Sequence, residues 1–155
     1  MYSRSPNNAA KKEALRFLSL RDHGRYELQQ KLLNKGFGLN DIDDAIVFCH
    51  EHHYLDDLRY AKDQVRLQAS KGHGEHRIRQ ELQAKRVGGD VINQALREEP
   101  QDWFELAKLS VEKHLHDALT VDSQEYARQV RTLQFLGFSL EQIQYALSST
   151  SLSTN

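Results

Sequence analysis

We predict an all-α protein in which three tandem repeats, each a unit of three helices, form an elongated, curved array. Shifting the sequence by fifty residues places HGRYELQQKLLNKGFGLNDIDDAI on HGEHRIRQELQAKRVGGDVINQAL. The matched residues are mostly apolar and have the spacing of one helical face. The chain also contains only two prolines, Pro6 and Pro100, so two long stretches lack the commonest helix breaker.

The third copy of the repeat is more divergent than the first two. Its segment LGFSLEQIQYAL at 136–147 matches KGFGLNDIDDAI at 35–46. Upstream of this match, Gln129 falls on Leu28 of the first copy unless Val130 takes that position. Terminal units of repeat proteins often diverge because they cap the array. Since a unit of this size buries little apolar surface alone, we expect neighbouring units to pack end to end.

The repeat pattern places the helices in order along the chain. We expect the first helices of the units at Ala9–Leu20, Asp57–Ala69 and Asp102–His114, the second at Arg25–Lys35, Glu75–Arg86 and Gln124–Leu136, and the third at Leu39–His52, Gly89–Glu98 and Leu140–Ser148. The repeats then span residues 9–52, 53–100 and 101–150. Residues 1–8 and 151–155 are expected to form flexible tails.

Turn residues support these boundaries. The residues just before the third helices, where an N-cap belongs, are Gly38, Gly88 and Ser139. Ser139 followed by Gln142 has the spacing of a capping box. Gly36 and Gly137 come directly after the second helices, at a position that commonly takes a left-handed conformation.

Composition favours a soluble protein of a reducing compartment. The single cysteine, Cys49, excludes an intramolecular disulfide. The polar N-terminus has no apolar run behind it, which argues against a secretory signal, and no stretch approaches the roughly 20 apolar residues of a membrane span. We therefore expect a cytoplasmic protein, and we expect it to be a monomer.

Charge is distributed unevenly, although the formal net charge is only -1. Residues 59–86 carry eight basic and three acidic side chains, whereas residues 87–155 carry five basic and ten acidic ones. The basic segment predicts a binding surface for a phosphate backbone or an acidic protein groove. The alternative is a solvated helical face that also carries Asp63 and Glu81. The candidate partner-binding residues are Arg59, Lys62, Arg66, Lys71, Arg77, Arg79, Lys85 and Arg86.

Signals for catalysis or metal binding are weak. His50 and His53 share a helical face beside Glu51 and Cys49, but the sequence contains neither HExxH nor CxxC. We expect the histidines of this segment to end a helix and to interact with its last carbonyls. The glycine-rich segment KGHGEH is interpreted as a turn, with an anion contact at the following helix as the alternative. We predict no catalytic residue, no metal and no cofactor.

Residues 54–87 closely resemble the middle signature of RecX regulatory proteins. That signature runs roughly Y-L-[DN]-D-x-R-[YF]-A, then K-G-x-G-P-x-R-I-x-x-E-L-x-x-K-G-[IV]. The matching residues here are Tyr54, Leu55, Asp56, Asp57, Arg59, Tyr60, Ala61, Lys71, Gly72, Gly74, Arg77, Ile78, Glu81, Leu82 and Lys85. The first repeat, LSLRDHGRYELQQKLLNKGF, is also similar to the family pattern. Three residues depart from it: Gly24 replaces a capping serine, Glu75 a proline, and Arg86 a glycine.

The resemblance implies a modulator of the RecA recombinase. Proteins of this family bind the RecA–DNA filament, are thought to lie in its groove, and block its growth, so that strand exchange, ATP hydrolysis and co-protease activity fall. Two alternatives remain open at this point. One is a direct DNA-binding protein whose units act like helix-turn-helix modules. The other is a helical enzyme with a histidine-rich metal site.

Overall fold

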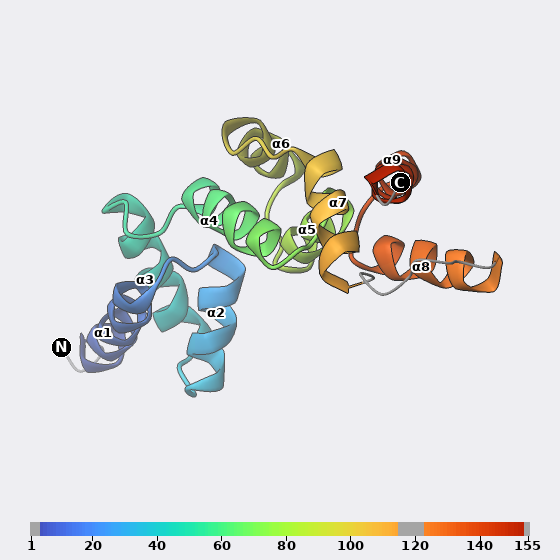
Figure 1. The fold of residues 1–155 in the computed structure, drawn as a ribbon. Coiled ribbons are helices and arrows are strands. Elements are labelled where there is room, and N and C mark those ends of the chain that lie inside the picture. The colour runs from blue at the N-terminus through green and yellow to red at the C-terminus, as the bar shows by residue number, and fades with distance from the viewer. Residues whose placement is uncertain (1–3, 115–122, 154–155) are drawn as a thin grey trace. The chain divides into compact units, whose positions relative to one another are not determined.

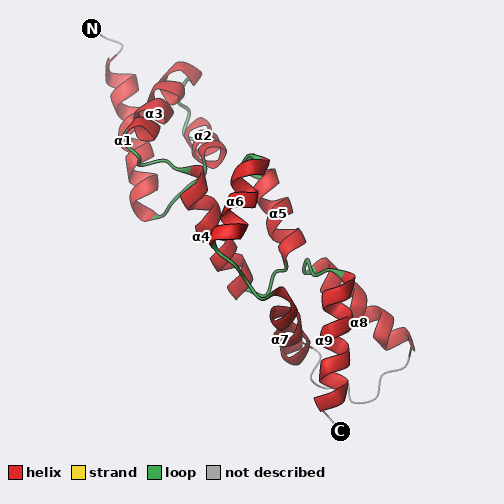
Figure 2. Ribbon diagram, turned by 90° about the horizontal axis from the view of Figure 1, so that it is seen from above, coloured by secondary structure: helices red, strands yellow, loops and turns green. Residues whose placement is uncertain are grey.

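The computed structural model describes residues 4–114 and 123–153. In this part of the chain all regular structure is helical (Figures 1 and 2), which confirms the predicted all-α class. The helices are α1 (Arg4–Leu20), α2 (Arg25–Asn34), α3 (Leu39–Glu51), α4 (Asp57–Ser70), α5 (Glu75–Ala84), α6 (Gly89–Glu98), α7 (Trp103–His114), α8 (Ser123–Phe135) and α9 (Leu140–Ser153).

The helix ends differ from the expected ones mainly at three places. Helix α1 begins at Arg4, inside the expected tail, and Pro6 stands in its first turn, where a missing N–H breaks no helical hydrogen bond. Helix α9 continues to Ser153 because no glycine or proline follows Leu147. Helix α5 ends two residues early, at Ala84.

The chain divides into two compact units. The first unit comprises Met1–Asp63 and Leu82–Ala95, and the second unit comprises Gln64–Glu81 and Leu96–Asn155. The division passes through α4, α5 and α6, so the expected middle repeat contributes to both units. The boundaries of the repeats and the curved array stay predictions.

Each unit has its own apolar core. In the first unit, α1 packs against α3, and the buried core side chains are Ala10, Ala14, Leu28, Leu32, Ile42, Ala45, Ile46, Cys49 and Leu55. In the second unit, α7 packs against α9 around Ala107, Val111, Leu133, Phe138, Ile143, Ala146 and Leu147. The matched repeat positions therefore supply core residues in both units, as the sequence alignment predicts.

The divergent part of the third repeat uses both residues that the alignment left open. Gln129, which falls on Leu28, is buried, and its side-chain amide lies 3.5 Å from a carboxylate oxygen of Glu125. Val130 is partly buried and packs against the same core. A polar side chain therefore occupies a core position of the first repeat, with its amide directed at a carboxylate one turn away.

The same turn ends α2, α5 and α8. In the first case, the Gly36 N–H donates to the Leu33 carbonyl at 2.9 Å and the Phe37 N–H to the Leu32 carbonyl at 3.3 Å. This pair of bonds defines a Schellman motif, in which the penultimate residue is left-handed. The left-handed residue is Gly36 after α2 (φ 92°), Arg86 after α5 (φ 58°) and Gly137 after α8 (φ 107°). The positive φ of Arg86 explains why α5 stops before it.

Candidate functional site

Arg59 is built into the fold of the first unit. Its Nε donates to both carboxylate oxygens of Asp22, at 3.0 and 3.1 Å. The other guanidinium nitrogens donate to the backbone carbonyls of His53 at 3.3 Å and Tyr54 at 3.1 Å. The side chain therefore holds the turn between α3 and α4 against the α1–α2 loop, and we assign it a structural role.

Three arginines of the second unit have acidic partners. On α5, Arg79 Nε donates to Glu75 at 2.8 Å and Arg77 Nε donates to Glu81 at 3.0 Å, each across one helical turn. The guanidinium of Arg77 also lies over the ring of Phe135, 5.1 Å from its centroid. Arg66 on α4 is ion-paired with Glu99, which follows α6.

Lys85 and Arg86 contact α2 within the first unit. Lys85 Nζ lies 3.8 Å from a carboxylate oxygen of Glu27. The Arg86 guanidinium stacks on the ring of Tyr26, 4.4 Å from its centroid. Both side chains are exposed, so solvent still reaches their charged ends.

The remaining two candidates differ in exposure. Lys62 lies half-buried on α4 and has an interaction partner. Lys71 lies in the turn after α4, is exposed, and makes no side-chain hydrogen bond or ion pair within residues 4–114 and 123–153.

The basic segment does not present one uncompensated patch. Its candidates are divided between the two units, and several are paired with carboxylates that lie far away in sequence, namely Asp22, Glu27 and Glu99. The sequence did not reveal these distant partners, because its charge pattern was compared only between neighbouring positions. Periodicity within one segment carries no signal for partners more than thirty residues away.

The glycine-rich segment has its own backbone partners. The Gly74 N–H donates to the Leu136 carbonyl at 2.7 Å, and the His76 N–H donates to the Gly137 carbonyl at 3.1 Å. These donors at the start of α5 are the groups that would bind an anion. Because the α8–α9 turn occupies these two amides, the turn interpretation is supported and the anion alternative loses two of its donors.

One of the histidines at the end of α3, His52, contacts its own helix. His52 Nδ1 lies 2.9 Å from the Phe48 carbonyl, and its ring lies 4.2 Å from the Phe48 ring. This agrees with the expected role at a helix end. Cys49 is buried in the core, and burial raises the pKa of its thiol. Among the described residues, no group of three histidine, cysteine or acidic side chains is placed to hold a metal ion.

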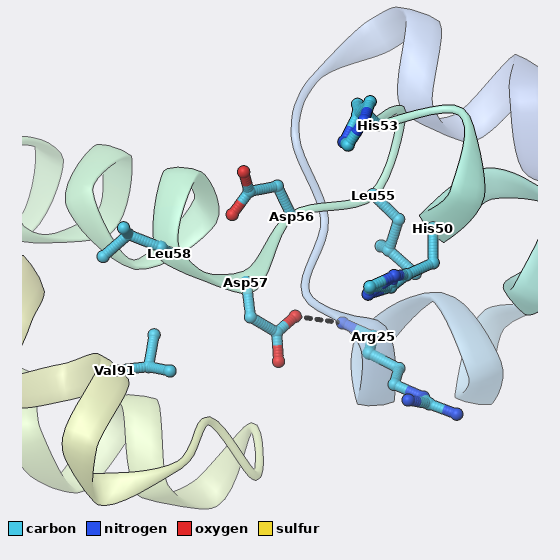
Figure 3. A pocket seen from close by; sticks show the side chains of 8 residues that line it. All are labelled: Arg25, His50, His53, Leu55, Asp56, Asp57, Leu58 and Val91. Carbon is cyan, nitrogen blue, oxygen red and sulfur yellow. Dashed lines mark hydrogen bonds between the residues drawn. The ribbon is translucent and has the colours of Figure 1, made fainter.

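A hollow of about 350 Å³ lies in the first unit where α2, α3, α4 and α6 approach one another (Figure 3). Its wall carries both signs of charge, from Arg25 on one side and from Asp56 and Asp57 on the other. Both carboxylates already cap helices: Asp57 accepts from the Arg25 N–H at 2.8 Å, and Asp56 accepts from the Arg59 N–H at 3.1 Å. A lining of mixed charge favours no ligand class. The lining residues are Arg25, His50, His53, Leu55, Asp56, Asp57, Leu58 and Val91.

A buried polar network lies beside α2. His23 is buried; its Nδ1 lies 3.0 Å from the Arg21 carbonyl and its Nε2 lies 2.8 Å from Lys31 Nζ. This arrangement requires a neutral imidazole with its proton on Nδ1. Burial lowers the pKa of His23 and of Lys31. Burial alone would raise the pKa of Glu27, but the hydrogen bonds and charge of Arg21 outweigh it and leave that pKa lowered.

Comparison with known proteins places this structure in a family. Residues 10–49 match the family model described as the first three-helix domain of RecX, and residues 56–96 match its second three-helix domain. A protein named "Regulatory protein RecX" from Vibrio parahaemolyticus is 60% identical over 144 residues, which cover 93% of each chain. The chain belongs to the RecX family. A RecX protein of Salmonella agona is 34% identical over 84% of this chain and 85% of its own.

Two solved RecX structures share the fold. A crystal structure of RecX from Lactobacillus salivarius matches with a TM-score of 0.80 at 20% identity, covering 96% of this chain and 99% of that one. A second structure, of regulatory protein RecX, matches with a TM-score of 0.84 at 21% identity over 95% of this chain and 75% of that one. Of the described helices, none is long and apolar enough to cross a membrane.

Several residues that match the RecX signature have structural roles in the first unit. Leu55 is buried in its core. Asp56 caps α4, Asp57 caps α2, and Arg59 ties the α3–α4 turn to Asp22. The LDD-x-R part of the signature is therefore explained by helix capping and packing.

The three departures from the RecX pattern also have a structural account. The ring of Tyr60 covers Gly24 so closely that a Cβ there would lie 3.0 Å from a ring carbon, and Asp57 supplies the missing side-chain cap. Glu75 gains an ion pair with Arg79. Arg86 keeps the left-handed turn despite its side chain. The turn geometry that these substitutions affect is retained.

Proposed function

We propose that this RecX-family chain is a non-enzymatic inhibitor of the RecA recombinase. It binds the RecA–DNA filament along its groove and limits filament growth, strand exchange and co-protease activity. Its setting is the cytoplasm, in DNA recombination, repair and the SOS response. Membership of the RecX family carries this proposal, because the resemblance to that family is what implies a RecA partner.

The basic side chains contribute unequally to the proposed contact. We assign it first to Lys71, Lys85 and Arg86, which are exposed at their charged ends. Arg66, Arg77 and Arg79 contribute to the contact through the exposed parts of their ion-paired side chains. Lys62 lies one turn before Arg66 on α4. Arg59 contributes mainly by holding the turn that it cross-links.

The test uses RecA filaments assembled on single-stranded DNA with a non-hydrolysable ATP analogue. We expect the purified chain to bind these filaments and to inhibit strand exchange. A Lys71→Glu variant should bind about 3- to 10-fold more weakly, mainly through a slower association rate, because exposed charges act on long-range attraction. Its melting temperature should not change. The matched control is Lys12→Glu, an exposed lysine on α1 that makes no side-chain ion pair within the described residues.

Three outcomes would contradict parts of this proposal. Failure of the wild-type chain to bind filaments would remove RecA as the partner. Equal affinity for free DNA and for filaments, with affinity falling steeply as salt increases, would favour the direct DNA-binding alternative. Equal losses in Lys71→Glu and Lys12→Glu would show a general charge effect and not a specific surface.

A further inference from the structure

The aromatic ring of Phe135 is the starting point for a second contact surface. Phe135 is the last residue of α8 and is 75% exposed, more than any other exposed large hydrophobic residue with a described side chain. Isolated exposed apolar residues are common. This ring differs because the guanidinium of Arg77, from α5, lies 5.1 Å above it, and Glu81 holds that guanidinium in turn through a 3.0 Å bond.

Close backbone contact between Gly74 and Gly137 holds Arg77 and Phe135 in place. The α8–α9 turn lies against the start of α5, as Figure 2 shows, and its Leu136 and Gly137 carbonyls accept the two hydrogen bonds described above. A Cβ on Gly137 would lie 2.5 Å from the Cβ of Arg77. The Arg77–Phe135 stack therefore exists only while the turn is docked on α5, with both parts inside the second unit.

The charges around Phe135 indicate the chemistry of its partner. Arg131 lies one turn earlier on the same helical face; it is exposed and makes no ion pair within the part of the chain that the structure describes. Arg77 adds a second guanidinium beside the ring. Aromatic residues and arginines are enriched among the interface residues that contribute most of the binding energy between proteins. Its complement is an apolar pocket bordered by carboxylates.

We infer that Phe135, with Arg77 and Arg131, is an anchor that inserts into an acid-bordered apolar pocket of a protein partner. This inference rests on the proposed function and assigns that pocket to the protein surface of the RecA filament. A nucleic acid fits this surface less well. Single-strand binding requires rows of stacking aromatics along a basic groove, whereas residues 87–155 carry ten acidic and five basic side chains.

The test is a Phe135→Ala variant of the full chain, measured against the same immobilised RecA filaments. Because the side chain is exposed, the melting curve should match wild type. The affinity for filaments should fall at least about tenfold, as expected for a central anchor. The matched control is Leu20→Ala, since Leu20 is 71% exposed at the end of α1 and its loss should leave the affinity unchanged. Arg131→Glu should weaken binding further when combined with Phe135→Ala.

Each other result overturns the inference in a recognisable way. Wild-type affinity in Phe135→Ala shows that the ring makes no important contact. If Phe135→Ala loses affinity for oligothymidylate without RecA by the same factor as for filaments, the ring stacks on bases and the partner is a nucleic acid. If wild type itself does not bind filaments, the proposed function fails, and the assignment of this surface to RecA fails with it.

Discussion

Replacing Gly74 by alanine should separate the start of α5 from the α8–α9 turn. A Cβ at this position would lie 2.5 Å from both the carbonyl carbon and the oxygen of Gly137 and 2.7 Å from the amide nitrogen of Phe138. All three are backbone atoms, which cannot rotate away as the end of a side chain can. The two segments must therefore move apart, and both hydrogen bonds between them must lengthen or break.

The expected cost follows from those two bonds. A backbone hydrogen bond contributes about 1 kcal/mol net, and a buried group left unpaired costs about 1–3 kcal/mol. Gly74 is buried, so its N–H gains little from solvent when the Leu136 carbonyl is lost. We expect Gly74→Ala to lower the free energy of unfolding by about 2–4 kcal/mol, a substantial part of the ~5–15 kcal/mol typical of a domain.

Urea unfolding followed by circular dichroism measures this change, and amide exchange at Gly74 and His76 locates it. The control is Gly89→Ala at the first position of α6, where an added Cβ meets no atom within 4 Å. That variant should be neutral or stabilised by up to about 1 kcal/mol, because alanine restricts the unfolded chain. If both variants had the same stability, the close backbone approach would not exist in solution.

Two further predictions concern Arg86 and His23. Arg86 has φ 58°, and only glycine avoids the penalty of this left-handed conformation. Arg86→Gly should therefore be more stable than Arg86→Ala by about 1–2 kcal/mol in urea unfolding. Equal stability of the two variants would argue against this turn. The free energy of unfolding should decrease as pH falls below about 6.5, the ordinary histidine pKa. Burial lowers the pKa of His23 and of His73 in the folded chain, so the unfolded chain takes up protons first, at up to about 1.4 kcal/mol per pH unit for each residue. A double His23→Gln, His73→Gln variant should lose most of this dependence, and an unchanged pH profile would assign it to other groups.

The apolar repeat pattern was sufficient to predict the helices because each helix buries one face. Ile42, Ile92 and Ile143 occupy the same position of the three repeats, and all three are fully buried. Local turn chemistry was equally informative. Ser139 and Gln142 form the expected capping box, with the Ser139 N–H donating to Gln142 Oε1 at 2.9 Å and the Gln142 N–H donating to Ser139 Oγ at 3.2 Å. Such signals depend on residues only a few positions apart.

Interactions between distant segments could not be predicted in the same way. The partners of Arg59 and Lys85 are Asp22 and Glu27, and nothing in the spacing of charges links these pairs. The left-handed conformation of Arg86 was also not predicted, and the expected helix therefore ran to Arg86 instead of ending at Ala84. Arginine is a good helix former, whereas the other two copies have glycine at this position. The basic composition of the candidate surface was therefore evident from the sequence. The pairing of its basic side chains with distant carboxylates became evident only from the structure.

The backbone contact at Gly74 also affects how the chain is synthesised. The ribosome makes Gly74 about sixty residues before Leu136, which corresponds to roughly 3–12 s at ordinary elongation rates. During that interval the first amides of α5 lack the carbonyls that finally accept them. The start of this helix cannot reach its final hydrogen bonding on the nascent chain until most of the remaining sequence has left the ribosome. Early termination before the α8–α9 turn would leave the basic segment with a frayed helix start.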